Sequence, residues 1–140
     1  MTQGHPAYRR YLDLFQKGEY RACHDVLEPL WLETRSGFYQ GLIQLAVAFL
    51  HLSNGNTAGA RKLLLRAHQH LEPYAPFHQG LDVEKLLKGV RESLDRLPEA
   101  QQITAEEAAS LGIEPARILV RCPPDGLTRA ECPSGEDGIR

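Results

Sequence analysis

The fold is decided by one stretch of the sequence, FYQGLIQLAVAFLHL at positions 38–52. Apolar side chains surround this stretch on nearly every side when it is drawn as a helix. A helix that is hydrophobic all round is buried among other helices rather than lying on a surface. We therefore predict a central helix here, with further helices packed around it.

Helical patterns flank this stretch on both sides. Before it, apolar residues at steps of three and four predict one helix over about residues 5–16 and a second from about residue 19. Because proline removes a helical hydrogen bond, we expect a kink or short break in the second helix at Glu28–Pro29. After it, the same spacing predicts helices over about residues 57–72 and 82–97. Thr104 and Glu107 predict a capping box that opens a short helix ending near residue 111.

The predicted fold class is all-α, a compact antiparallel bundle of about five helices arranged as stacked helical hairpins. A short helix and an irregular tail follow at the C-terminus. We divide the chain into a helical bundle domain, residues 1–98, and a C-terminal extension, residues 99–140, whose last part is rich in Pro, Gly and charge. Within the extension, residues 118–120 are expected to form a short extended piece.

Composition narrows the class of protein. The 140 residues are 42% hydrophobic and 24% charged, which is typical of a soluble domain. The formal net charge of -2 gives no reason to expect nucleic-acid or membrane-surface binding. We find no signal-peptide pattern and no apolar run long enough to span a membrane, so we expect a cytoplasmic protein. Among the three cysteines, Cys23 falls on an apolar helical stripe and is predicted to be a buried free thiol.

The most unusual polar residues are His24 and Glu28, four residues apart on what we predict to be the buried face of the second helix. If the second and third helices form an antiparallel hairpin, Glu28 lies level with Gln44, and Trp31 lies level with Gln40. These levels predict one buried polar cluster drawn from three helices. Its expected members are His24, Glu28, Gln40 and Gln44, with Arg66 or Arg35 as the counter-charge.

Three interpretations of this cluster stay open. It can be a structural hydrogen-bond network that rigidifies the core. It can be an acid–base or metal site, in which Glu28 acts as general base, His24 shares the proton, and His51 or His68 supplies a third metal ligand. It can belong to a pocket or groove that binds a peptide or small ligand, with Trp31, Tyr39 and the kink at Pro29 opening one edge of the bundle. Because glutamine is a poor ligand for zinc or iron and the His-Glu-x-x-His pattern is absent, we expect no metal and no cofactor.

A longer pattern runs through these helices: GEYRACHDVLE at 18–28, Trp31, FYQGLIQLA at 38–46, His51 and GNTAGA at 55–60. This pattern resembles the domain-of-unknown-function family 309 over about residues 8–97. The resemblance implies a compact helical bundle found in bacterial and archaeal proteins, and it implies no established activity. The family's signature polar positions correspond here to His24, Glu28, Trp31, Gln40, Gln44, His51 and Asn56.

The function that the sequence favours is a non-catalytic binding or protein-interaction module. The alternative is a hydrolase-like enzyme. His24 and Glu28 are the candidate catalytic residues. The candidate binding residues are Trp31, Gln40, Gln44, His51 and Arg66. We expect the partner to be another protein or a second copy of this chain.

Overall fold

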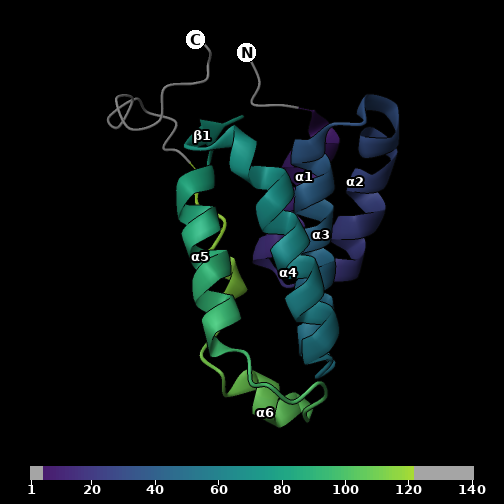
Figure 1. The fold of residues 1–140 in the computed structure, drawn as a ribbon. Coiled ribbons are helices and arrows are strands. Elements are labelled where there is room, and N and C mark those ends of the chain that lie inside the picture. The colour runs from purple at the N-terminus through teal and green to yellow at the C-terminus, as the bar shows by residue number, and fades with distance from the viewer. Residues whose placement is uncertain (1–4, 122–140) are drawn as a thin grey trace.

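Residues 5–121 are described in a computed structural model of the chain, and within them six α-helices account for most of the fold (Figure 1). The first four are α1 (Pro6–Gln16), α2 (Tyr20–Thr34), α3 (Gly37–Ser53) and α4 (Thr57–Leu71). The 3-10 helix η1 (Glu72–Tyr74) leads to a two-stranded sheet of β1 (Phe77–His78) and β2 (Leu81–Asp82). The chain continues through α5 (Val83–Arg96), α6 (Ala105–Ala109) and η2 (Pro115–Arg117). The prediction of an all-α bundle is confirmed.

Helix α3 is the centre of the bundle. It packs against α2 on one side and α4 on the other, and Figure 1 shows it between these two helices. Its side chains Phe38, Leu42 and Leu45 are fully buried, as the apolar pattern predicts. Gly41 allows the close approach of α4, because a Cβ atom there would lie 2.6 Å from Cγ of Leu71.

The helix boundaries follow local capping chemistry. The Ser36 hydroxyl accepts a hydrogen bond from the Phe38 N–H (3.1 Å) at the start of α3. Oδ1 of Asp82 accepts one from the Lys85 N–H (3.0 Å) at the start of α5. The capping box predicted at the start of α6 is present in full, with Thr104 as the N-cap. These caps satisfy N–H groups that the first turn of a helix leaves without partners.

The break predicted at Glu28–Pro29 does not occur. Helix α2 runs through Pro29 without interruption. A proline at this position removes one N–H group, so it costs the helix a single internal hydrogen bond. The buried side chains of Leu27 and Leu30, which flank the proline, hold both halves of α2 against the core. Tertiary packing therefore outweighs the local penalty.

The segment between the helices predicted over about residues 57–72 and 82–97 contains structure that helical periodicity does not reveal. It includes η1 and a tight hairpin in which Phe77 pairs with Asp82 and His78 pairs with Leu81. The two turn residues, Gln79 and Gly80, both have positive φ values, 47° and 75°. Two strands of two residues each are too short to show an alternating pattern in the sequence.

The described part of the extension, residues 99–121, lies against the bundle. The Ile103 N–H donates to the Gly55 carbonyl (2.9 Å), and the Thr57 hydroxyl donates to the Ala100 carbonyl. Farther along, the Asp82 N–H donates to the Val120 carbonyl (2.8 Å). The piece predicted to be extended over residues 118–120 forms no strand. Ile118 is the C-cap of η2, and the isolated bridge that follows pairs Arg121 with Leu81.

Helix α1 meets the end of the described chain. Nη2 of Arg121 lies 3.0 Å from Oδ1 of Asp13, and Nε2 of Gln16 donates to the Leu119 carbonyl at 3.3 Å. These contacts join segments that lie at opposite ends of the described sequence. Within residues 5–121, every helix is too short or too polar to cross a lipid bilayer.

Candidate functional site

His24 and Glu28 lie together on α2, but they lie at its surface. Their side chains are 37% and 46% exposed, and Nε2 of His24 is 4.0 Å from Oε2 of Glu28. The other imidazole nitrogen, Nδ1, lies 3.1 Å from Oδ1 of Asp25. The predicted burial of the pair is therefore wrong. The buried face of α2 is centred on Cys23, Leu27 and Leu30, and His24 and Glu28 flank it.

Gln44 pairs with a histidine on α4 instead of with Glu28. Its Oε1 accepts a hydrogen bond from Nδ1 of His70 (2.8 Å), which also lies 3.1 Å from the Arg66 carbonyl oxygen. Both partners are carbonyl oxygens, so Nδ1 carries the proton. Arg66 is expected as a counter-charge, but its guanidinium makes no ion pair with Glu28 in the described structure. The cluster predicted around Glu28 does not form.

His51 stabilises the turn between α3 and α4. Nδ2 of Asn56 lies 3.2 Å from Nδ1 of His51, and Oδ1 of Asn56 accepts from the Gly59 N–H (2.9 Å). Gly59 leaves room for the imidazole, because a Cβ atom there would lie 3.0 Å from the ring. His51 and Asn56 therefore have a structural role in this turn.

The histidines considered as a third metal ligand have other partners. His51 faces Asn56, and Nε2 of His68 lies 3.1 Å from Nη1 of Arg91. Across residues 5–121, three or more His, Cys, Asp or Glu side chains nowhere come together in a way that would hold a metal ion.

Trp31 and Gln40 lie at the end of the α2–α3 hairpin nearest its turn. The Arg35 guanidinium sits 5.0 Å from the centroid of the Trp31 ring, which is a cation–π distance. Nε1 of Trp31 is buried and has no hydrogen-bond acceptor among the described residues. Gln40 is half-buried. Next to Trp31 in the sequence, Leu32 is 48% exposed.

A polar and aromatic cluster around the β1–β2 hairpin escapes prediction from the sequence. The Tyr8 and Tyr39 hydroxyls both donate to Gln79, the first to its carbonyl (3.0 Å) and the second to its Oε1 (3.2 Å). The imidazole of His78 packs edge-on against Phe38, with ring centroids 4.5 Å apart. Burial lowers the pKa of His78. These residues come from three distant segments, and helical spacing contains no signal that unites them.

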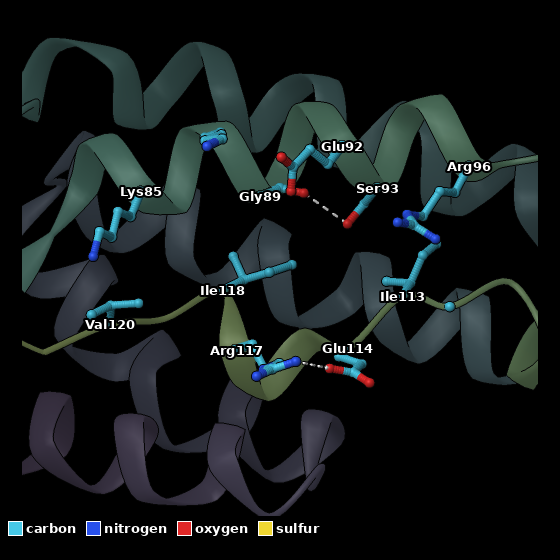
Figure 2. Close-up of a pocket in the computed structure, with 12 residues that line it drawn as sticks. Lys85, Gly89, Glu92, Ser93, Arg96, Ile113, Glu114, Arg117, Ile118 and Val120 are labelled. Atoms are coloured by element: carbon cyan, nitrogen blue, oxygen red, sulfur yellow. Dashed lines mark hydrogen bonds and ion pairs between the residues drawn. The ribbon is translucent and has the colours of Figure 1, made fainter.

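A pocket of about 380 Å³ lies between α5 and residues 112–120 (Figure 2). Cationic side chains from both elements line it, and none belongs to the residues predicted as a site. Helical spacing places Lys85, Lys88 and Arg96 on α5, but nothing in the sequence indicates that the segment around Ile118 packs beside them. The pocket is therefore visible only in the folded chain.

Comparisons with known proteins agree with the sequence pattern. The family model described as "Domain of unknown function (DUF309)" matches residues 8–63. The Uncharacterized protein YpuF of Bacillus subtilis (strain 168) is 32% identical over 133 residues, which cover 90% of this chain and 71% of that protein. No solved structure matches the chain. The match to the family model, together with a relative aligned over most of both chains, shows that the chain belongs to the DUF309 family.

Proposed function

We propose that the chain is a non-catalytic protein-interaction module, which binds its partner through the outer edge of α2. This α2 edge consists of His24, Glu28, Trp31, Leu32 and Arg35. The observation that carries the proposal is the exposure of a large apolar side chain, 48% for Leu32, beside the half-buried Trp31. Tryptophan and arginine are enriched at the centres of protein interfaces, where they supply most of the binding energy.

The charges on α2 favour a basic partner. Helix α2 carries three carboxylates, those of Asp25, Glu28 and Glu33, against one arginine, Arg21, and the C-cap Arg35 lies over the Trp31 ring. None of these carboxylates lies within 4.0 Å of a lysine or arginine elsewhere in residues 5–121. Complementary charge accelerates association and excludes wrong partners. We therefore infer that the partner segment carries positive charge and also an apolar side chain that packs against Leu32.

The exposure of His24 and Glu28 favours binding over acid–base catalysis. A carboxylate that acts as a general base near neutral pH has its pKa raised by burial or by a neighbouring charge. Glu28 is nearly half exposed, and its Oε2 is 4.0 Å from His24, which is beyond hydrogen-bond distance. A cytoplasmic location fits the free thiol of Cys23, because free thiols persist in reducing compartments.

The test uses a matched pair of surface variants. Leu32 on α2 and Leu65 on α4 are equally exposed, 48% and 49%, so Leu32→Asp and Leu65→Asp remove the same apolar area. Each is expected to change the free energy of unfolding by no more than about 0.5 kcal/mol, because both side chains lie at the surface. The wild-type chain and both variants are immobilised and exposed to extract from the source organism, and retained proteins are quantified by mass spectrometry.

We expect a protein with a basic segment to be retained by the wild type and by Leu65→Asp. Leu32→Asp is expected not to retain it. Its binding weakens as salt rises, because the contact is partly electrostatic. Light scattering of the purified chain separates a foreign partner from a second copy. Equal retention by all three chains, or no retention by any, would contradict the α2 edge as the binding surface.

A further inference from the structure

The pocket beside α5 is separate from the α2 edge and independent of the proposed function. One wall is the face of α5 that carries Lys85, Gly89 and Ser93, and the other is the segment from Gly112 to Val120 (Figure 2). Its volume of about 380 Å³ is within the range of small-molecule sites, roughly 300–1,000 Å³. The pocket can therefore hold a compact ligand.

The lining of the pocket is positively charged. Four lining side chains are cationic, Lys85, Lys88, Arg96 and Arg117, and two are carboxylates, Glu92 and Glu114. Arg117 and Glu114 are already paired at 2.9 Å, as Figure 2 shows. The three α5 cations make no ion pair with any described residue, and Glu92 is the one remaining carboxylate. A concave surface with excess positive charge concentrates anions.

Arg96 is held in place by the backbone of the opposite wall. Its Nη1 donates to the Leu111 carbonyl at 3.3 Å. Gly112, with a φ of 79°, leaves room for the guanidinium, because a Cβ atom there would lie 2.7 Å from Nη1. Among residues 5–121 the other N–H groups of this guanidinium have no hydrogen-bond acceptor, so they can bind a ligand. The planar guanidinium matches the two oxygens of a carboxylate or phosphate.

The base of the pocket is apolar. Ile118 is buried and packs against α5 at Gly89, where a Cβ atom would lie 2.8 Å from its Cγ1. Ile113 and Val120 extend this apolar surface on either side and are half-buried. A bare ion would leave the exposed parts of Ile113 and Val120 in contact with water, whereas a ligand with a hydrocarbon body would cover them.

We propose that this pocket binds a small organic anion. Its carboxylate or phosphate group is held by the Arg96 guanidinium. Lys85 and Lys88, about three and two helical turns away along α5, add positive potential over the rest of the pocket. Its apolar body lies on Ile118 and the neighbouring apolar side chains. This assignment explains both the excess of cations and the apolar base.

The test is an NMR titration of the ¹⁵N-labelled full chain with benzoate, phenyl phosphate, inorganic phosphate and benzyl alcohol. Benzoate or phenyl phosphate is expected to shift the amide signals of Gly89, Gly112 and Ile118 in a saturable way. Which of the two binds more tightly distinguishes a carboxylate ligand from a phosphate ligand. Arg96→Gln is expected to weaken binding about tenfold, the effect of losing a charge-assisted hydrogen bond. Lys88→Gln gives a second, independent variant.

The matched control is Lys62→Gln, which removes an exposed cation from α4, outside the pocket. It is expected to leave binding unchanged. The proposal is overturned if Lys62→Gln weakens binding as much as Arg96→Gln, if benzyl alcohol produces the same shifts, or if neither organic anion shifts the pocket amides. Equal affinity for inorganic phosphate and phenyl phosphate would also overturn it, because the apolar base would then contribute nothing.

Discussion

Gln79 has a backbone conformation that few side chains adopt. Its φ of 47° lies in the left-handed region, where glycine, asparagine and aspartate are usual. With Gly80 it forms a two-residue hairpin turn with positive φ at both positions, a geometry that matches the twist of the paired strands. The Tyr8 and Tyr39 hydroxyls bond to Gln79 and offset the cost of this conformation. The hairpin is therefore fixed to α1 and α3 by its most strained residue.

The neighbouring His78 predicts a dependence of stability on pH. Burial lowers its pKa below the usual value of about 6.5, so the folded chain binds its proton less readily than the unfolded chain. This contribution to stability is complete above about pH 6.5 and is lost as the pH falls toward the lowered pKa. We expect the wild type to lose more stability than His78→Gln between about pH 7.5 and about pH 5.5, measured by urea unfolding.

The comparison uses the pH-dependent loss rather than the absolute stability, because His78→Gln also removes contacts with Phe38 and Tyr74. Parallel pH profiles for the two chains would show that the imidazole is protonated as easily in the folded state as in the unfolded state. That result would refute the role given to burial.

Five of the residues that the family resemblance points to fall into two groups by their contacts. Gln44 joins α3 to α4 through His70, and His51 with Asn56 shapes the turn between these helices. His24 and Glu28 hold no comparable structural position, because they face solvent. A structural role therefore accounts for the first group and leaves the second for the proposed interaction.

At the scale of elements, periodicity predicts the helices well but does not fix their rotation. The spacing of Cys23, Leu27 and Leu30 identifies α2 and its buried face. The spacing does not show how much of the α2 surface the neighbouring helices bury. His24 lies just outside the buried part. The same limit explains why Gln44 meets His70 on α4 rather than Glu28 on α2. Partner choice depends on the packing of three helices, which no single helix encodes.

The close contact between α3 and α4 predicts that a small substitution at Gly41 lowers the stability of the fold. In Gly41→Ala the new Cβ would lie 2.6 Å from Cγ of Leu71, a fully buried side chain with little room to move. Alanine gains about 1 kcal/mol of helix propensity over glycine, but overpacking costs about 1–3 kcal/mol. We expect a net loss of about 1 kcal/mol or more in the free energy of unfolding, measured by urea denaturation.

Gly37→Ala at the start of the same helix is the control. The nearest atom to its added Cβ is the Tyr74 hydroxyl at 3.3 Å, at the end of a half-buried side chain that can move. Its effect is expected to stay within about 0.5 kcal/mol. If Gly41→Ala were as stable as Gly37→Ala, close contact between α3 and α4 would not be required.

At the scale of the whole molecule, the path of residues 99–121 is what the sequence could not predict. The capping box of α6 is local, so Thr104 and Glu107 identify it directly. The contacts of this segment with Gly55 and with α5 join residues that are far apart in the sequence, and no repeating pattern in the sequence indicates them. The pocket depends on those contacts, so it could not be predicted either.

We expect the chain to lose stability when the segment after residue 98 is removed. This deletion tests the division between the bundle domain, residues 1–98, and the extension. Ile118 and Leu119 are 7% and 4% exposed, and both belong to the common core. Burying such a side chain contributes about 1.5–3 kcal/mol, partly offset by the entropy of ordering the segment. A chain that ends at residue 98 is therefore expected to unfold at lower urea concentration than the full chain.

A chain that ends at residue 121 is the matched control, because it keeps every described contact of the segment. It is expected to unfold near the urea concentration of the full chain. A residue 1–98 chain as stable as both would show that the bundle is an independent domain and that the segment adds nothing to it.

The contacts between α1 and the end of the described chain affect the order of events during synthesis. The bonds that Asp13 and Gln16 make to Arg121 and Leu119 span 108 and 103 residues. A ribosome releases α1 early, and α1 can pack against α2 and α3 while translation continues. The contacts of α1 with Leu119 and Arg121 can form only after residue 121 has left the exit tunnel. These contacts are therefore among the last of the described structure to form on each new chain.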